Sequence, residues 1–210
     1  MDNLYLYFIA LSVAAGLISL KNKLPLTLKV FLVFLCYTLV NELITVKMNG
    51  ANHWLYNIYN YIRIALLSFI YLKLLVTPIL KKIIKGFLIS LPAWFAISFF
   101  LLDGIHQLHT PTVLAACVAF VFMSTGYLYE LLLYPTQENL LRKPFFWIST
   151  GILFYFLGNL PYLGSINYLV KKDMKLAMQL YYIVYILNAV MYTLFVVAFV
   201  STWNRRKSSI

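Results

Sequence analysis

Charge is scarce in this chain of 210 residues, and negative charge is the scarcest. Asp and Glu number six against 17 Lys and Arg, and charged residues make up 11% of the sequence, whereas soluble domains carry roughly 25%. A chain that is 63% hydrophobic cannot cover its surface with polar side chains, so most of that surface must face lipid. The composition argues against a soluble domain and indicates an integral membrane protein whose main partner is the lipid bilayer.

The formal net charge of +11 would favour a nucleic-acid partner in a soluble protein. In a membrane protein, Lys and Arg collect at the cytoplasmic ends of the helices, and we therefore predict no nucleic-acid partner.

Cysteine is scarce as well. Cys36 and Cys117 both lie inside apolar runs, which argues against a disulfide framework or a zinc site and predicts two reduced packing residues.

Catalytic signatures are also missing. The sequence has no HExxH, no phosphate-binding glycine loop, no CxxC and no Ser-His-Asp set in a suitable context. The last apolar run has no lysine for a retinal Schiff base, and no run has the arginine series of a voltage sensor. The segment "DGIHQLH" contains His106 and His109, but its spacing is not that of an established metal site. We predict no catalytic residue, metal or cofactor, and an enzymatic activity is the less favoured alternative.

Seven apolar runs fill the chain, each about long enough to cross ~30 Å of hydrocarbon at ~1.5 Å per residue. The breaks between them carry loop residues, as in "KNKLP", "NGANHW" and "TPILKKIIKG". The sequence therefore predicts an all-α fold, a bundle of seven transmembrane helices that forms a single domain over residues 1–210. The predicted spans are 4–20, 28–46, 55–76, 86–102, 112–134, 144–170 and 177–203.

The basic residues of the short loops predict the orientation of the bundle. Ten lie on one side and four on the other, which places the tail "NRRKSSI" in the cytoplasm and the N-terminus outside. Asp2 stands where a signal peptide would have basic residues, so the first run is predicted to be a span. The ten are Lys21, Lys23, Lys81, Lys82, Lys85, Arg142, Lys143, Arg205, Arg206 and Lys207, and the four are Lys47, Lys171, Lys172 and Lys175.

Two features belong to the predicted cytoplasmic side. The basic segment "ILKKIIKG" between the third and fourth runs is predicted to lie at the inner leaflet, attracted to anionic headgroups. Glu130 lies near the inner end of the fifth run. A proton or cation site is one interpretation of this carboxylate, and we favour a side chain that reaches out to the cytoplasmic interface.

Arg63 is the charge that an apolar run explains least. It lies in "YNIYNYIRIALL", ~12 Å below the outer end of the third span, and Glu42 lies ~7 Å deep on the second span. Charges inside a membrane are costly and usually pair or face a cavity. We therefore predict an ion pair between Arg63 and Glu42. Asn60 should lie beside the pair, one helical turn away, with Asn57 a turn further out.

Other polar residues fall in the same outer half of the predicted bundle. They are Asn159 beside Pro161, with Gln179 and Asn188 on the last span. Together with the Arg63 group, they predict the wall of an outward-facing cavity, and Pro161 predicts that the sixth helix bends or unwinds there. The alternative is that these side chains bond to one another as contacts between helices.

The chain resembles small, uncharacterised seven-span membrane proteins of Bacteroidota. The stretches that carry the resemblance are "LYNIYNYIRIALLSFIYLKLL", "KPFFWISTGILFYFLGNLPYLG" and "ILNAVMYTLFVVAF". The resemblance implies a location in the bacterial inner membrane. It implies no activity and no catalytic residues.

Three functions remain open. The first is a receptor-like sensor that binds a ligand in the outer cavity and signals through a separate cytoplasmic partner. The second is an oligomeric channel or a membrane effector of a defence or stress system. The third is a transporter of small solutes or a membrane enzyme acting on lipid. The sequence shows no polar stripe that continues to the cytoplasm, which favours the sensor.

Overall fold

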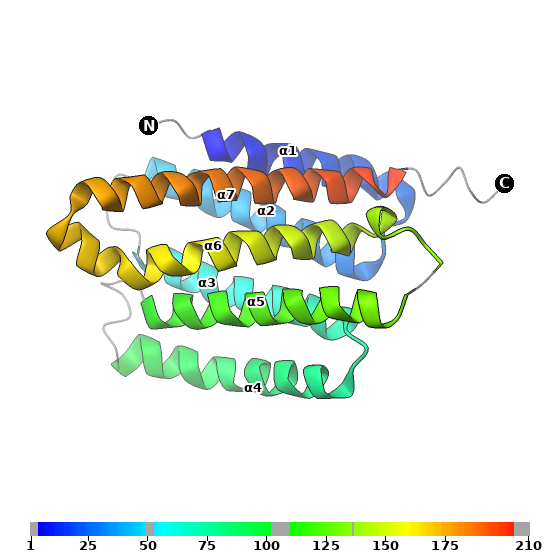
Figure 1. The fold of residues 1–210 in the computed structure, drawn as a ribbon, viewed down its shortest axis with the longest axis horizontal. Coiled ribbons are helices and arrows are strands. Elements are labelled where there is room, and N and C mark those ends of the chain that lie inside the picture. Colours follow the sequence, from blue (N-terminus) through cyan, green and yellow to red (C-terminus); the bar gives the residue numbers. More distant parts are fainter. Residues whose placement is uncertain (1–3, 49–52, 102–109, 136, 204–210) are drawn as a thin grey trace. The chain divides into compact units, whose positions relative to one another are not determined.

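The computed structural model describes residues 4–48, 53–101, 110–135 and 137–203. Within these ranges the long elements are all α-helices, and no strand occurs (Figure 1). The all-α prediction is confirmed, and most helix ends fall within three residues of the predicted ones. The helices are α1 (Leu4–Ser19), α2 (Leu26–Lys47), α3 (His53–Leu74), α4 (Pro78–Leu101), α5 (Thr110–Leu133), α6 (Pro144–Lys172) and α7 (Met174–Val200), with short 3-10 turns η1 (Leu20–Asn22) and η2 (Leu140–Arg142).

Six of these helices are long and apolar enough to cross a membrane, and α3 is the exception. Its 22 residues would suffice in length, since ~20 residues span the hydrocarbon. Its N-terminal half, however, carries Asn57, Asn60 and Arg63, which lower its mean hydropathy. The described residues therefore contain six candidate spans, and the seventh stays a prediction.

The start of α4 differs from the prediction. The segment "TPILKKIIKG" was expected to be a break, yet α4 begins at Pro78 and includes Lys81, Lys82 and Lys85. Proline is favoured in the first turn of a helix because its missing N–H has no intrahelical acceptor there. Isoleucines alternate with the lysines at helical spacing, and Ile84 is buried while Lys85 is exposed. The basic segment is thus two turns of an amphipathic helix.

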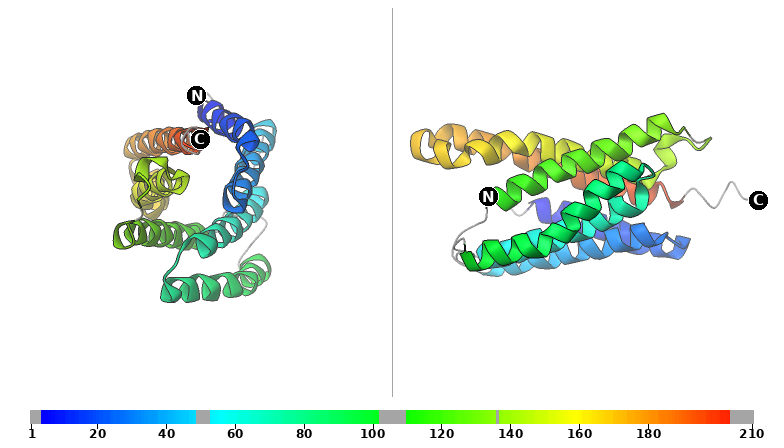
Figure 2. Two further views of the ribbon diagram at one scale, coloured as in Figure 1. Left: turned by 90° about the vertical axis from the view of Figure 1, so that its right-hand side faces the viewer. Right: turned by 90° about the horizontal axis from the view of Figure 1, so that it is seen from below.

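One compact unit contains residues 1–24 and 117–210, and its described helices are α1, α6, α7 and most of α5. Helix α7 packs against both α6 and α1 and lies between them in Figure 2. Two glycines bring α6 close to α7. A Cβ atom added at Gly151 would lie 3.3 Å from the backbone oxygen of Met191, and one added at Gly158 would collide with the Leu187 side chain.

The first and last helices of this unit are joined at one end by hydrogen bonds. The Ser19 hydroxyl, whose single hydrogen can be donated to the backbone oxygen of Ala15 at 2.7 Å or of Phe199 at 3.2 Å, accepts the Trp203 indole N–H at 2.8 Å. Ser19 is fully buried. A buried hydroxyl requires a partner, so this contact ties the segment that follows α7 to the end of α1.

Pro161 lies inside α6, where proline removes one backbone hydrogen bond and bends the helix. The chain remains helical through this segment, and the helix changes direction in its last third in Figure 1. The predicted bend is therefore present without unwinding.

The prediction for Glu130 was wrong: its side chain is 5% exposed, so it is buried among neighbours instead of reaching the interface.

The second compact unit contains residues 25–116, and its described helices are α2, α3, α4 and the first turns of α5. Helix α3 packs against α2 and α4 and lies between them in Figure 2. The core of this unit uses large side chains, among them Phe31, Leu35, Ile64 and Tyr71, all at most 1% exposed. Burial of such side chains fixes how α2, α3 and α4 pack together.

Candidate functional site

Two polar stripes lie on adjacent helices of the second unit. On α2 the stripe consists of Thr38, Asn41, Glu42 and Thr45, and on α3 it consists of Tyr56, Tyr59, Asn60 and Arg63. Each set has the spacing i, i+3, i+4 and i+7, which places its members on one face of a helix. Because α2 packs against α3, we call these eight residues, together with Asn57, the α2–α3 polar layer.

The two stripes touch through tyrosine. The hydroxyl groups of Tyr59 and Thr38 lie 3.1 Å apart, within hydrogen-bond distance. Thr38 also donates to the backbone oxygen of Phe34 at 2.9 Å, which leaves Tyr59 as the donor between the two hydroxyls. Nearer the loop between the helices, the Tyr56 hydroxyl lies close to the side chains of Glu42 and Thr45. Tyrosine therefore connects the polar side chains of α2 to those of α3.

Tyr59 lies near both charges of the layer. The guanidinium carbon of Arg63 lies 5.5 Å from the centre of the Tyr59 ring, a distance at which a cation and an aromatic face attract. The charges of Arg63 and Glu42 both lie close enough to the Tyr59 hydroxyl to interact with it electrostatically. Both charged side chains are half-buried. Direct contact between Arg63 and Glu42 stays a prediction, and their shared neighbour Tyr59 is consistent with it.

Three asparagines of the layer are buried. Asn41 and Asn57 are each 2% exposed and Asn60 is 6% exposed. Asn41 differs from the other two, because both its Oδ1 and its Nδ2 lack a hydrogen-bond partner among the described residues. A buried amide without partners costs ~1–3 kcal/mol. This side chain therefore requires a partner that the described part of the chain does not supply.

The remaining predicted site residues lie in the other unit. Asn159 is 7% exposed, Asn188 is half-buried and Gln179 is exposed. The Oδ1 atoms of Asn159 and Asn188 also lack partners among the described residues. Glu42, Asn57, Asn60 and Arg63 are thus gathered on α2 and α3, whereas Asn159, Gln179 and Asn188 belong to α6 and α7. A single cavity formed by both groups stays a prediction.

Sequence reasoning missed the threonines and tyrosines of the polar layer. Thr38, Thr45, Tyr56 and Tyr59 were not included in the predicted site. The available signal was the i, i+3, i+4, i+7 spacing around Glu42 and Arg63. That signal is weak in a chain with 17 tyrosines, because most tyrosine and threonine side chains in apolar runs pack without a polar role.

A metal centre finds no support among the residues that the structure describes, where no group of three His, Cys, Asp or Glu could hold an ion. His53 begins α3, and the segment that contains Asp103, His106 and His109 lies outside the described residues. The predicted absence of a metal thus stays a prediction.

Comparisons with protein-family models, curated proteins and solved structures found no match for this chain.

Proposed function

We propose that this protein is a receptor-like sensor in the membrane that binds a small polar solute at the α2–α3 polar layer. The observation that carries the proposal is Asn41, a buried amide whose donor and acceptor both lack partners among the described residues. It belongs to the same polar stripe as Glu42 and lies on the helix that packs against the Arg63 stripe. A polar ligand that displaces water here would satisfy the amide.

The charges of the layer define the class of ligand. One guanidinium and one carboxylate balance each other, so the layer favours a solute without net charge. Arg63 complements a carboxylate and Glu42 an ammonium group, while asparagine amides supply both donors and acceptors. Free amino acids, which are zwitterions, have this combination of groups and are the first probes to use.

A sensor fits this layer better than a channel does, because the layer ends in an apolar core. Beyond Thr38 towards the start of α2, the buried side chains are Leu28, Phe31, Leu32, Phe34 and Leu35. Beyond Arg63 on α3 the buried residues are chiefly apolar, with Ser68 as the small polar exception. An ion path requires polar groups or water along its whole length. The signal would therefore be passed on by helix movement to a separate cytoplasmic partner.

Ligand binding can be measured as stabilisation of the purified protein in detergent. A ligand at ~100 times its Kd stabilises the folded state by about 2.7 kcal/mol, which thermal unfolding with each of the amino acids would detect. Asn41→Leu should abolish that response while the unliganded protein keeps or gains stability, because a buried unsatisfied amide is removed. Asn22→Leu, at the end of η1, is the matched control and should respond like the unsubstituted chain.

Two outcomes would contradict the binding proposal. One is that no amino acid or small neutral polar solute shifts the unfolding temperature of the unsubstituted protein. The other is that Asn41→Leu responds as fully as Asn22→Leu. If the predicted cavity extends to the other unit, Asn159→Leu should weaken the response too, and an unchanged response would confine the site to α2 and α3.

We further propose seven spans in a bacterial inner membrane, with the N-terminus outside and the C-terminus in the cytoplasm. The support is the distribution of Lys and Arg, and the length of α3. Gly50→Cys should react with an impermeant thiol reagent added outside intact cells, and Lys207→Cys should react only after the cells are opened. The unsubstituted chain, whose Cys36 and Cys117 lie within helices, is the control. Reaction of both positions from the same side would contradict this topology.

A further inference from the structure

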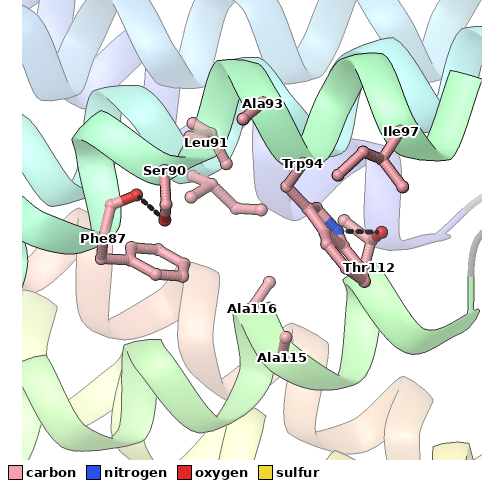
Figure 3. Close-up of a pocket in the computed structure, with 10 residues that line it drawn as sticks. Phe87, Ser90, Leu91, Ala93, Trp94, Ile97, Thr112, Ala115 and Ala116 are labelled. Atoms are coloured by element: carbon pink, nitrogen blue, oxygen red, sulfur yellow. Dashed lines mark hydrogen bonds between the residues drawn. The ribbon is translucent and has the colours of Figure 1, made fainter.

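A pocket of about 380 Å³ lies in the second unit, between α4 and the first turns of α5 (Figure 3). Its volume is within the roughly 300–1,000 Å³ of ligand pockets. Phe87 lies at one end and Trp94 and Ile97 at the other, and small side chains leave the space between them open: Ala93 on α4, and Ala115 and Ala116 on α5. Ile64 of α3 contributes to the lining.

The polar atoms of this pocket are already bonded. The Ser90 hydroxyl donates to the backbone oxygen of Phe87 at 2.9 Å. The Thr112 hydroxyl accepts the Trp94 indole N–H at 2.9 Å and lies 3.4 Å from the hydroxyl of Tyr61. The remaining lining residues are apolar. A ligand here gains by covering apolar surface, and a polar solute would meet only two hydroxyl groups, both of which already take part in hydrogen bonds.

The length of the pocket along α4 matches the thickness of the hydrocarbon in one lipid leaflet. From Phe87 to Ile97 it follows α4 for roughly 15 Å, which is half of the ~30 Å of hydrocarbon. Phe87, its first lining residue on α4, follows Lys85 by two residues. The pocket therefore begins next to the basic end of the helix. Helix α4 is a candidate span with only 17% of its apolar window buried, so most of the helix is free to face lipid chains.

Charge at the basic end of α4 selects the headgroup. Lys82 and Lys85 are exposed and Lys81 is half-buried, and the sequence has no Asp or Glu from Val76 to Leu102. Ile83 is 49% exposed and lies one turn before Phe87, on the same helix face. The lysines lie on the other sides of α4, so an apolar track on the Ile83 face leads from the first turns of the helix into the pocket, and lysines beside a span attract anionic headgroups.

We propose that this pocket binds one acyl chain of an anionic phospholipid, whose headgroup is held by the lysines in the first turns of α4. The occupant differs in class from the polar solute of the α2–α3 polar layer, so the two proposals can fail independently. A lipid at this position would fill the gap between α4 and α5 and hold α4 against α3 in the bilayer.

Trp94 supplies the measurement, because bromine atoms on an acyl chain quench the fluorescence of a nearby indole. The full chain is placed in zwitterionic vesicles that contain increasing small fractions of brominated phosphatidylglycerol or brominated phosphatidylcholine. The same titration with Trp94→Phe identifies which part of the quenching belongs to Trp94. We expect the quenching of Trp94 to saturate, and to do so at a several-fold lower fraction of brominated phosphatidylglycerol than of brominated phosphatidylcholine. A binding site is occupied at lipid fractions too low for frequent random contact.

Two variants test the pocket and one tests the headgroup. Ala115→Leu, from an exposed position, should fill the pocket and remove the saturable quenching, and Ala93→Leu should do the same if the first variant does not fold. Ala14→Leu, exposed on α1, is the matched control. In the triple variant K81Q/K82Q/K85Q, the two brominated lipids should quench the Trp94 fluorescence equally. Equal quenching by both lipids in the unsubstituted chain, or an Ala115→Leu variant that behaves like Ala14→Leu, would overturn the proposal.

Discussion

Replacing Arg63 by alanine should lower the free energy of unfolding of the detergent-solubilised protein by up to about 3–5 kcal/mol, the loss found when one member of a fully buried ion pair is left alone. The cost arises because Glu42 would keep its charge in a half-buried position without the neighbouring cation. Glu42→Ala should have a similar effect for the same reason, since Arg63 would then lie unneutralised against Tyr59.

The double variant Arg63→Ala with Glu42→Ala should cost much less than the sum of the two single variants, because both charges leave together. Denaturant titration followed by circular dichroism gives the four free energies of this cycle. Lys47→Ala, an exposed charge in the last turn of α2, is the control and should change stability by no more than ~0.5 kcal/mol. Additive losses in the cycle would show that the two charges do not interact.

Gly151→Leu should have the largest effect in the other unit and should prevent stable packing of α7 on α6. Even a Cβ atom at this position would lie 3.3 Å from the backbone oxygen of Met191 and 3.3 Å from the Phe195 ring. A leucine has three further carbon atoms to place. Backbone cannot move aside as a side chain can, so the loss should exceed the ~1–3 kcal/mol typical of added methylenes in a packed core.

Two other glycines calibrate this result. Gly164→Leu, on the same helix, meets nothing within 4 Å and should be neutral or stabilising, because leucine is a better helix former than glycine by up to ~1 kcal/mol. Gly158→Ala meets the end of the flexible Leu187 side chain, which can change rotamer, so its loss should be smaller than that of Gly151→Leu. An unfolding curve for Gly151→Leu that matches Gly164→Leu would contradict this account of the α6–α7 contact.

The sequence alone predicted where most helices begin and end. Helix α1 was expected at 4–20 and spans Leu4–Ser19, and α6 was expected at 144–170 and spans Pro144–Lys172. These predictions succeed because an apolar run bounded by proline or lysine has only one way to satisfy its backbone in lipid. The rule failed at the start of α4, where lysine was taken as a sign of a loop. Lysine is a good helix former, and its long side chain can leave the apolar face.

The charged part of the candidate site was also visible in the sequence. Arg63 and Glu42 stand out because charges in apolar runs are rare, and they led to Asn57 and Asn60. The roles of Tyr59 and Asn41 were not visible. A tyrosine hydroxyl acquires a polar role only when another helix brings Thr38 to 3.1 Å, and the period of one helix does not determine which face of the next helix it meets.

Tertiary structure alone decided the burial of Glu130, the close approach of α6 to α7 at Gly151, and the pocket between Trp94 and Ala115. Each depends on the side chains of at least two segments that are separate in the sequence. The size of a side chain at one position leaves a gap or a collision only in relation to its neighbours in space. Local sequence therefore determined which segments are helices and where along them the charges fall, while packing determined which polar groups meet and where space for a ligand remains.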